Sequence, residues 1–154
     1  MDMLMILLAK YLYLLIALLA VIYLLMQSRA KQKQIIIFSI IVLPLAYLVA
    51  KIAGHFYFDP RPFVVHHVKP LIPHAPTNGF PSDHALLSFA IASIIFVFNK
   101  KIGILLGILG LFVGISRIYV MVHSPMDIVA SFVISVVVVG LVFYLSRKVF
   151  RIGL

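Results

Sequence analysis

The chain has 154 residues, of which 64% are hydrophobic and only 11% are charged. Soluble domains average about 45–50% apolar and about 25% charged residues, so this composition excludes an ordinary water-soluble globule and favours an integral membrane protein. The length allows one domain, which we expect to cover residues 1–154. The absence of cysteine excludes disulfides and thiolate metal sites. The net charge of +9 does not indicate a nucleic-acid partner, because the cations stand in small groups between apolar runs.

Five apolar segments predict an all-α integral membrane protein, a bundle of about five transmembrane helices. A helix needs about 20 apolar residues to cross a hydrocarbon core roughly 30 Å thick. The segments, in chain order, are Met3–Met26, Ile35–Ala53, Ala85–Phe98, Ile102–Val122 and Ile128–Leu145. The third has fourteen residues and reaches spanning length only if its helix begins at Ser82. The first is too long for the core of a signal peptide, so we interpret it as a retained span.

The short connections between these segments carry most of the positive charge. They are residues 27–33, 99–101 and the tail 146–154. Eight of the thirteen lysines and arginines lie there: Arg29, Lys31, Lys33, Lys100, Lys101, Arg147, Lys148 and Arg151. The positive-inside rule places these connections in the cytoplasm, where the cations also contact lipid headgroups. Five spans then bring residues 55–81 and 123–126 together on the extracytoplasmic side.

The ionisable residues gather on that outer face. All six histidines lie between positions 55 and 123, and three of the four acids lie between positions 59 and 127. Four further cations belong to the same side: Lys51, Arg61, Lys69 and Arg117. Ionisable residues at a membrane edge are costly and usually functional. The sequence therefore predicts a site at the outer membrane face.

The stretch SRIYVMVHSPMD, residues 116–127, places His123 and Asp127 four residues apart. On a helical turn this spacing brings the carboxylate beside the imidazole, where it holds one ring nitrogen and raises the basicity of the other. Arg117 precedes His123 by six residues, close to two turns, so both can face one pocket. Pro125 marks a bend or a helix start. The pattern suits a nucleophile or base beside an anion-binding arginine; it suits equally a polar cluster that only ties two spans together.

The stretch DPRPF, residues 59–63, fixes the chain around Arg61, because Pro60 and Pro62 stop helix continuation. A rigidly held arginine at a membrane surface suggests an anion clamp. The alternative is an arginine whose apolar stem lies along the membrane while its head contacts lipid headgroups.

The stretch PSDH places Ser82 at the expected N-cap of the third span. Asp83 then lies in the first helical turn, where the helix dipole favours a negative charge. The free amides of this helix start and the Ser82 hydroxyl form an expected anion site. A Ser-His-Asp triad of Ser82, His84 and Asp83 fits poorly, because adjacent residues on one turn point in different directions.

Two arginines, a helix N-terminus and two histidines on one face fit phosphoryl transfer, in which positioning and charge neutralisation supply most of the catalysis. One histidine would be the nucleophile and another would protonate the leaving oxygen. The apolar composition makes a lipid phosphate or diphosphate the natural substrate.

Three motifs resemble the signatures of the type-2 phosphatidic acid phosphatase superfamily. KIAGHFYFDPRP, PSDH and SRIYVMVHSPMD match, in order, a lysine followed by Arg-Pro, a Pro-Ser-Gly-His, and Ser-Arg-x5-His-x3-Asp. They run from Lys51 to Asp127, half of the chain. The longer string LIPHAPTNGFPSDHA is similar to the bacterial undecaprenyl-diphosphatase branch, which recycles the cell-wall carrier lipid.

The resemblance implies a role for each matched residue. His123 would attack the terminal phosphorus and form a phosphohistidine, Asp127 would orient it, and His84 would protonate the leaving oxygen. The residues expected to hold the phosphoryl oxygens are Arg61, Arg117, Ser82 and, as the lysine of the first signature, Lys51. The family needs no metal, so we expect neither a metal nor another cofactor.

Two positions depart from the signatures. The family places its lysine seven residues before the arginine, whereas position 54 is glycine here and Lys51 lies ten residues before Arg61. Lys51 is thus displaced by about one helical turn, and a longer connecting loop would be needed to restore its contact with the phosphate. Asp83 replaces a glycine and would repel a diphosphate unless it points away or is paired, for example with Lys69. We expect this change to affect substrate choice rather than abolish catalysis.

Three further histidines, His66, His67 and His74, occupy the outer loop. With His55 they could form a metal site, but a solvated or headgroup-facing loop is the favoured interpretation.

The leading functional hypothesis is an enzyme that releases phosphate from undecaprenyl diphosphate, with membrane lipids as its other partners. The alternatives are a phosphatase for phosphatidylglycerol phosphate, phosphatidic acid or lipid A, and a non-catalytic membrane protein that binds anions or lipids. The sequence does not determine the oligomeric state.

Overall fold

The computed structural model describes the backbone of residues 1–150 and the side chains of residues 1–146. The described part is all-helical apart from one isolated bridge between Pro60 and Asn78. Its helices are α1 (Asp2–Leu25), α2 (Arg29–Phe56), α3 (Pro62–Val65), α4 (Asp83–Phe98), α5 (Lys100–Tyr119) and α6 (Pro125–Phe150). The cationic side chains expected at Arg147, Lys148 and Arg151 lie outside the described side chains.

The predicted helical membrane bundle is confirmed, because each apolar segment forms one long helix in the expected order. By length and composition, α1, α2, α5 and α6 are able to cross a membrane, and α4 is a shorter apolar helix of 16 residues. Large apolar side chains such as Leu18, Ile40, Leu111 and Val137 point outward and are exposed. Such a surface is typical of helices that face lipid, so the chain is a multi-pass membrane protein.

The helices extend beyond the apolar segments that predicted them, most clearly at the starts of α2 and α5 and at both ends of α6. α2 begins at Arg29, six residues before the predicted Ile35, and α5 begins at Lys100 in the expected connection 99–101. The Asn99 side chain accepts a hydrogen bond from the Ile102 N–H at 3.2 Å and caps α5. Hydropathy missed these turns because a helix outside the hydrocarbon layer needs no apolar residues.

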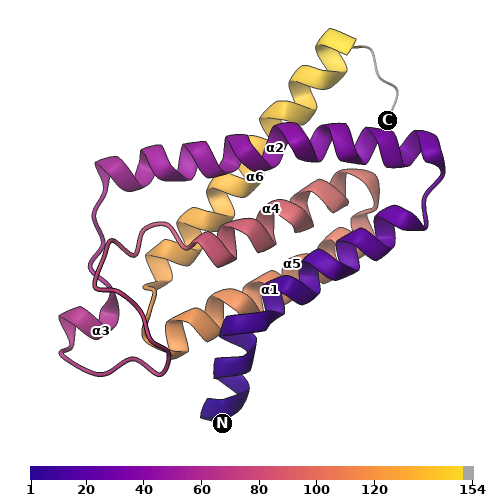
Figure 1. Ribbon diagram of the computed structural model, residues 1–154. Coiled ribbons are helices and arrows are strands. Elements are labelled where there is room, and N and C mark those ends of the chain that lie inside the picture. The colour runs from indigo at the N-terminus through magenta and orange to yellow at the C-terminus, as the bar shows by residue number, and fades with distance from the viewer. Residues whose placement is uncertain (151–154) are drawn as a thin grey trace.

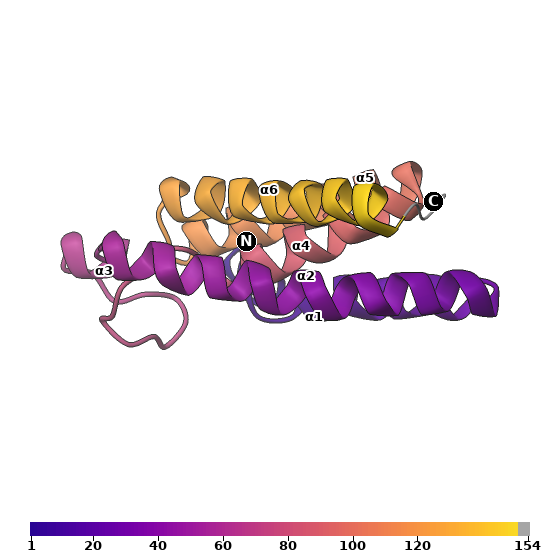
Figure 2. The ribbon, with the colours of Figure 1, turned by 90° about the horizontal axis from the view of Figure 1, so that it is seen from above.

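α4 is the central helix of the bundle and packs against α1, α2, α5 and α6. Figure 2 shows α1 and α2 in one layer and α5 and α6 in another, with α4 between them. Small residues at such interfaces let membrane helices approach closely. At Gly103 in α5, an added Cβ would lie 2.3 Å from the Cα of Phe96, so only glycine permits this contact with α4.

The loops on both sides of α3 and the turn between α5 and α6 lie at one end of the bundle, opposite the α1–α2 and α4–α5 connections (Figure 1). Backbone hydrogen bonds join these segments: Phe63 N–H donates to the Met121 carbonyl at 3.1 Å, and Leu71 N–H donates to the Val120 carbonyl at 3.4 Å. The residues of all three predicted signatures therefore lie at the same end of the molecule.

Candidate active site

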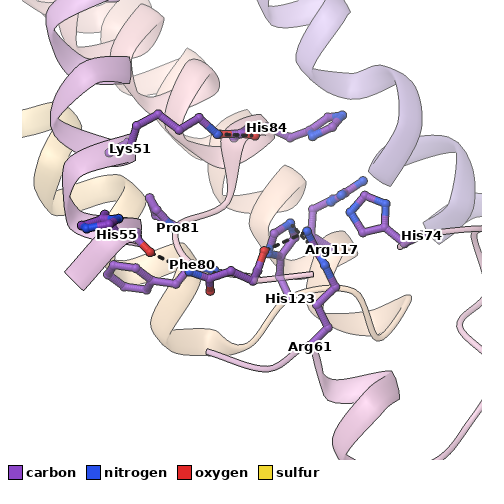
Figure 3. Close-up of a pocket in the computed structure, with 13 residues that line it drawn as sticks. Lys51, His55, Arg61, His74, Phe80, Pro81, His84, Arg117 and His123 are labelled. Atoms are coloured by element: carbon purple, nitrogen blue, oxygen red, sulfur yellow. Dashed lines mark hydrogen bonds and ion pairs between the residues drawn. The ribbon is translucent and has the colours of Figure 1, made fainter. Parts of the chain in front are cut away.

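A cavity of about 410 Å³ opens among these loops and helix ends. Its wall contains ionisable residues from all three signatures and one from the outer loop (Figure 3). These residues are Lys51, His55, Arg61, His74, Asp83, His84, Arg117 and His123. The tertiary structure thus brings together side chains that the sequence separates by up to 72 positions.

His123 in the cavity wall forms a buried pair with Asp127, which lies behind it. The His123 Nδ1 and Asp127 Oδ2 atoms are 3.0 Å apart, and the residues are 3% and 1% exposed. The Ser124 N–H also donates to Asp127 Oδ2, at 2.8 Å, which fixes the carboxylate at the start of α6. Because a carboxylate only accepts, Nδ1 carries the hydrogen and Nε2 keeps its lone pair. Nε2 lies 3.5 Å from Arg61 Nη1.

The surroundings of His123 favour its neutral form. Burial lowers the pKa of His123 below its ordinary value of 6.5, and the positive charges of Arg117 and Arg61 lower it further, while the hydrogen bond to Asp127 opposes the shift. A histidine whose pKa is lowered is neutral at pH 7 and is charged only in more acidic solution. His123 therefore holds an unprotonated nitrogen available for attack on an electrophile.

Arg61 and Arg117 are both buried, at 8% and 3% exposed. Arg61 donates from Nη1 to the Val122 carbonyl at 2.8 Å and from Nη2 to the Asn78 carbonyl at 3.2 Å. Arg117 donates from Nη1 to the carbonyl of Ala9, at 3.4 Å, so α1 also supports the site. Among the described side chains, the Nε atoms of both arginines are buried without a hydrogen-bond partner. Buried polar groups are nearly always paired, so these two N–H groups are exceptions within the described part of the chain.

Ser82 occupies the N-cap position of α4, as predicted, but its side chain makes no capping hydrogen bond. Ser82 is fully buried and does not line the cavity, whereas its neighbours Pro81 and Asp83 do. The Ser82 N–H donates to the Asp127 carbonyl at 3.5 Å, and the Ser82 carbonyl accepts from Ser131 Oγ at 3.0 Å. Ser82 thus joins α4 to α6, and its own Oγ has no hydrogen-bond partner in the described part of the chain.

The adjacent Ser82, Asp83 and His84 do not form a triad. Asp83 pairs with Lys51, whose Nζ lies 3.3 and 3.5 Å from the two carboxylate oxygens, rather than with the suggested Lys69. The ring of His84 packs edge-on against Tyr13 of α1, with ring centroids 4.5 Å apart. The carboxylate that holds a histidine here is Asp127, on a different helix.

The glycine at position 54 has a steric cause. A Cβ at Gly54 would lie 2.7 Å from the carbonyl oxygen of Phe80, so no side chain fits there. Lys51, one turn earlier on α2, is the lysine that lines the cavity. The loop before α4 therefore excludes a lysine at position 54, where the first signature would have it, and the lysine of this helix stands at position 51.

Asn78 is a positioning residue that the sequence did not reveal. Its Oδ1 accepts from the N–H groups of Asp59 and Phe80, each at 3.0 Å, and its Nδ2 donates to the carbonyls of Gly54 at 2.8 Å and Tyr57 at 3.0 Å. One amide thus ties the end of α2 and Asp59 to the loop that precedes α4. The sequence offered only an Asn-Gly pair, which is a general turn signal.

His74 lines the cavity although the residue is exposed, so its position is compatible with the solvated loop expected from the sequence. Its ring centroid is 6.3 Å from that of His123. Burial, together with the charges of Arg61 and Arg117, lowers the pKa of His74 to about 4, so the ring is neutral at pH 7. His66 and His67 are exposed and do not line the cavity. Within the described residues, no three His, Asp or Glu side chains are arranged to hold a metal ion.

Residues 34–151 match the model of the PAP2 superfamily, so the chain belongs to this superfamily of phosphatases, as its motifs predicted. It is 37% identical over 142 residues to the bacitracin transport permease protein BcrC of Bacillus licheniformis, covering 92% of this chain and 70% of that protein. It is 44% identical over 95 residues to the undecaprenyl-diphosphatase BcrC of Bacillus subtilis strain 168, covering 62% of this chain and 49% of that protein. The chain thus spans about half the length of the second relative.

The fold also resembles a solved structure. The crystal structure of Aquifex aeolicus LpxE superimposes with a TM-score of 0.73 at 25% sequence identity, covering 93% of this chain and 85% of that chain. The helical arrangement around the cavity is therefore shared with a known structure over nearly the whole chain.

Proposed function

We propose that the protein removes the terminal phosphoryl group of undecaprenyl diphosphate, giving undecaprenyl phosphate and inorganic phosphate, and so recycles the cell-wall carrier lipid. The supporting observation is the buried His123–Asp127 pair facing two buried arginines in one cavity of a membrane-helix bundle. The name of the Bacillus subtilis relative supports the choice of lipid.

The geometry suggests a two-step mechanism. The lone pair of His123 Nε2 attacks the terminal phosphorus, the bond from that phosphorus to the bridging oxygen breaks, and His84 gives a proton to the leaving oxygen. Asp127 holds Nδ1–H throughout, and Arg61 and Arg117 neutralise the transferred phosphoryl group. Water then attacks the phosphohistidine, giving its proton to His84 and releasing inorganic phosphate. The arginines supply the positive charge that metal ions supply in other phosphoryl-transfer sites, so the proposed mechanism uses no metal.

A substrate panel tests this function. Purified protein in detergent micelles is given undecaprenyl diphosphate, undecaprenyl phosphate, phosphatidylglycerol phosphate, phosphatidic acid and lipid A, and inorganic phosphate release is measured. We expect kcat/KM to be highest for undecaprenyl diphosphate by about tenfold or more, corresponding to about 1.4 kcal/mol of transition-state stabilisation. A higher value for another lipid would reassign the substrate, and tight binding without turnover would show a non-catalytic protein.

The proposed site faces the extracytoplasmic side, and single-cysteine labelling tests this orientation. The chain has no native cysteine, so Thr77→Cys in the exposed outer loop provides one thiol. In intact cells we expect a membrane-impermeant maleimide to label this thiol. Ser28→Cys, between α1 and α2, is the matched control, because Ser28 is exposed and makes no capping hydrogen bond. It should be labelled only after the cells are opened, and the reverse pattern would invert the topology.

A further inference from the structure

The ion pair of Lys51 and Asp83 lies in the wall of the same cavity as the nucleophile. Figure 3 shows Lys51 apart from the group formed by Arg61, Arg117 and His123. Lys51 stands one helical turn before Gly54, further from the loop that carries Arg61. The cavity therefore holds basic side chains at two places, Lys51 with its partner Asp83 and the two arginines, and the proposed transfer of one phosphoryl group uses only the arginines.

The position of the Lys51 ammonium is fixed by two contacts. Its Nζ lies 3.3 Å from Asp83 Oδ1 and 4.8 Å from the centroid of the Tyr47 ring, on the preceding turn of α2. An ammonium has three N–H donors, so the pair with Asp83 leaves donors for another anion. The Lys51 side chain is 52% exposed and lines the cavity, so a ligand there can reach it.

Position 54 does not provide an alternative site for a cation. The Phe80 carbonyl fills the space that a side chain would need, and Asn78 Nδ2 holds the Gly54 carbonyl at 2.8 Å. The positive charge on this helix is therefore placed at Lys51, three residues before the position that the signature gives to its lysine. Three helical residues correspond to about 4.5 Å along the axis, so this charge lies apart from the position that the signature gives to its lysine.

We propose that Lys51, positioned by Asp83, binds the lipid-side phosphoryl group of a diphosphate while Arg61 and Arg117 bind the terminal one. The inference rests on the proposed function and explains how the site prefers a diphosphate over a monophosphate. When the bond to the terminal phosphorus breaks, negative charge accumulates on the lipid-side phosphate, where the Lys51 ammonium stabilises it. A monophosphate has no group at that position, so it gains less from Lys51.

Asp83 acts in this proposal as a positioning residue and not as a repelling charge. Its carboxylate neutralises Lys51 in the empty site, which lowers the cost of keeping a lysine at the edge of the hydrocarbon layer. It also holds the ammonium on the cavity wall beside His84, the next residue in the chain. Asp83 replaces the glycine of the second signature, and Lys51 is the displaced lysine of the first. In this proposal the two departures act together as one ion pair.

The test compares farnesyl diphosphate with farnesyl phosphate, which share one prenyl chain and differ by one phosphoryl group. The readout is the ratio of kcat/KM for the diphosphate to kcat/KM for the monophosphate. We expect Lys51→Met to lower this ratio by about tenfold to a hundredfold, the effect of losing a hydrogen bond to a charged group. Lys51→Arg keeps the charge and should retain most of the preference. Lys69→Met removes an exposed lysine that does not line the cavity and should leave the ratio unchanged.

The role of Asp83 is tested with Asp83→Asn alone and combined with Lys51→Met. Because the two side chains are in contact, we expect the change in ratio caused by Asp83→Asn to disappear once Lys51 is replaced. Fully additive effects would show that Asp83 does not act through Lys51. An active wild type whose ratio is unchanged in Lys51→Met would overturn the inference and leave the proposed function standing. A wild type that releases phosphate from neither substrate would contradict both.

Discussion

Replacing His123 with alanine is expected to abolish phosphate release, with kcat falling by roughly 10⁴-fold or more, as when the nucleophile of another hydrolase is removed. The reason is geometric: the buried pair with Asp127 leaves Nε2 as the unprotonated nitrogen, and no other histidine in the cavity makes a carboxylate contact among the described residues. Without His123 the phosphoryl group has no acceptor other than water.

The measurement has two parts. Phosphate release is followed with undecaprenyl diphosphate, and brief incubation with a substrate labelled in the terminal phosphate is followed by denaturation. The wild type should retain an acid-labile, base-stable label, as a phosphohistidine does, and His123→Ala should retain none. His66→Ala is the matched control, because His66 is exposed and outside the cavity. Activity retained in a monodisperse His123→Ala protein would refute the assignment of the nucleophile.

Replacing His84 with alanine is expected to lower kcat by about 10²–10⁴-fold for a lipid monophosphate, the range over which a general acid contributes. The loss should be smaller for the corresponding diphosphate. An alkoxide is a much poorer leaving group than a phosphate, and it therefore depends more on the proton that His84 supplies.

The farnesyl phosphate and farnesyl diphosphate pair measures this difference directly. His84→Ala should raise the ratio of diphosphate to monophosphate turnover, whereas Lys51→Met should lower it. The opposite signs separate a proton donor from a phosphate-binding residue, although both line one cavity. Equal losses on both substrates in His84→Ala would argue against an acid and for a structural role, for example through its contact with Tyr13.

The parts of the site predicted best were those with local geometry. The four-residue spacing predicted the contact of His123 with Asp127, although His123 lies in the turn before α6, and Pro125 indicated the start of that helix. The apolar segments likewise predicted every long helix, because hydrocarbon thickness fixes the length of a span. Apolar composition did not predict the polar ends of the helices, such as the first turns of α2.

The features that the sequence did not reveal depend on contacts between distant segments. The partner of Asp83 is Lys51, 32 residues earlier, and no periodicity relates the two. The position of His74 depends on the path of an irregular loop, and the hydrogen bonds of Asn78 depend on how that loop meets the end of α2. These positions are set by packing of the whole chain and not by any local pattern.

The shortness of α4 has a consequence for how a lipid reaches the site. Its 16 residues extend about 24 Å at 1.5 Å per residue, less than the hydrocarbon thickness of roughly 30 Å. If its far end, at Phe98, meets one surface of the bilayer, the end that carries His84 stays below the opposite surface. The phosphate groups of a carrier lipid would then be cleaved at headgroup depth, with the prenyl tail still dissolved in the membrane. The enzyme would have no need to lift its substrate out of the bilayer.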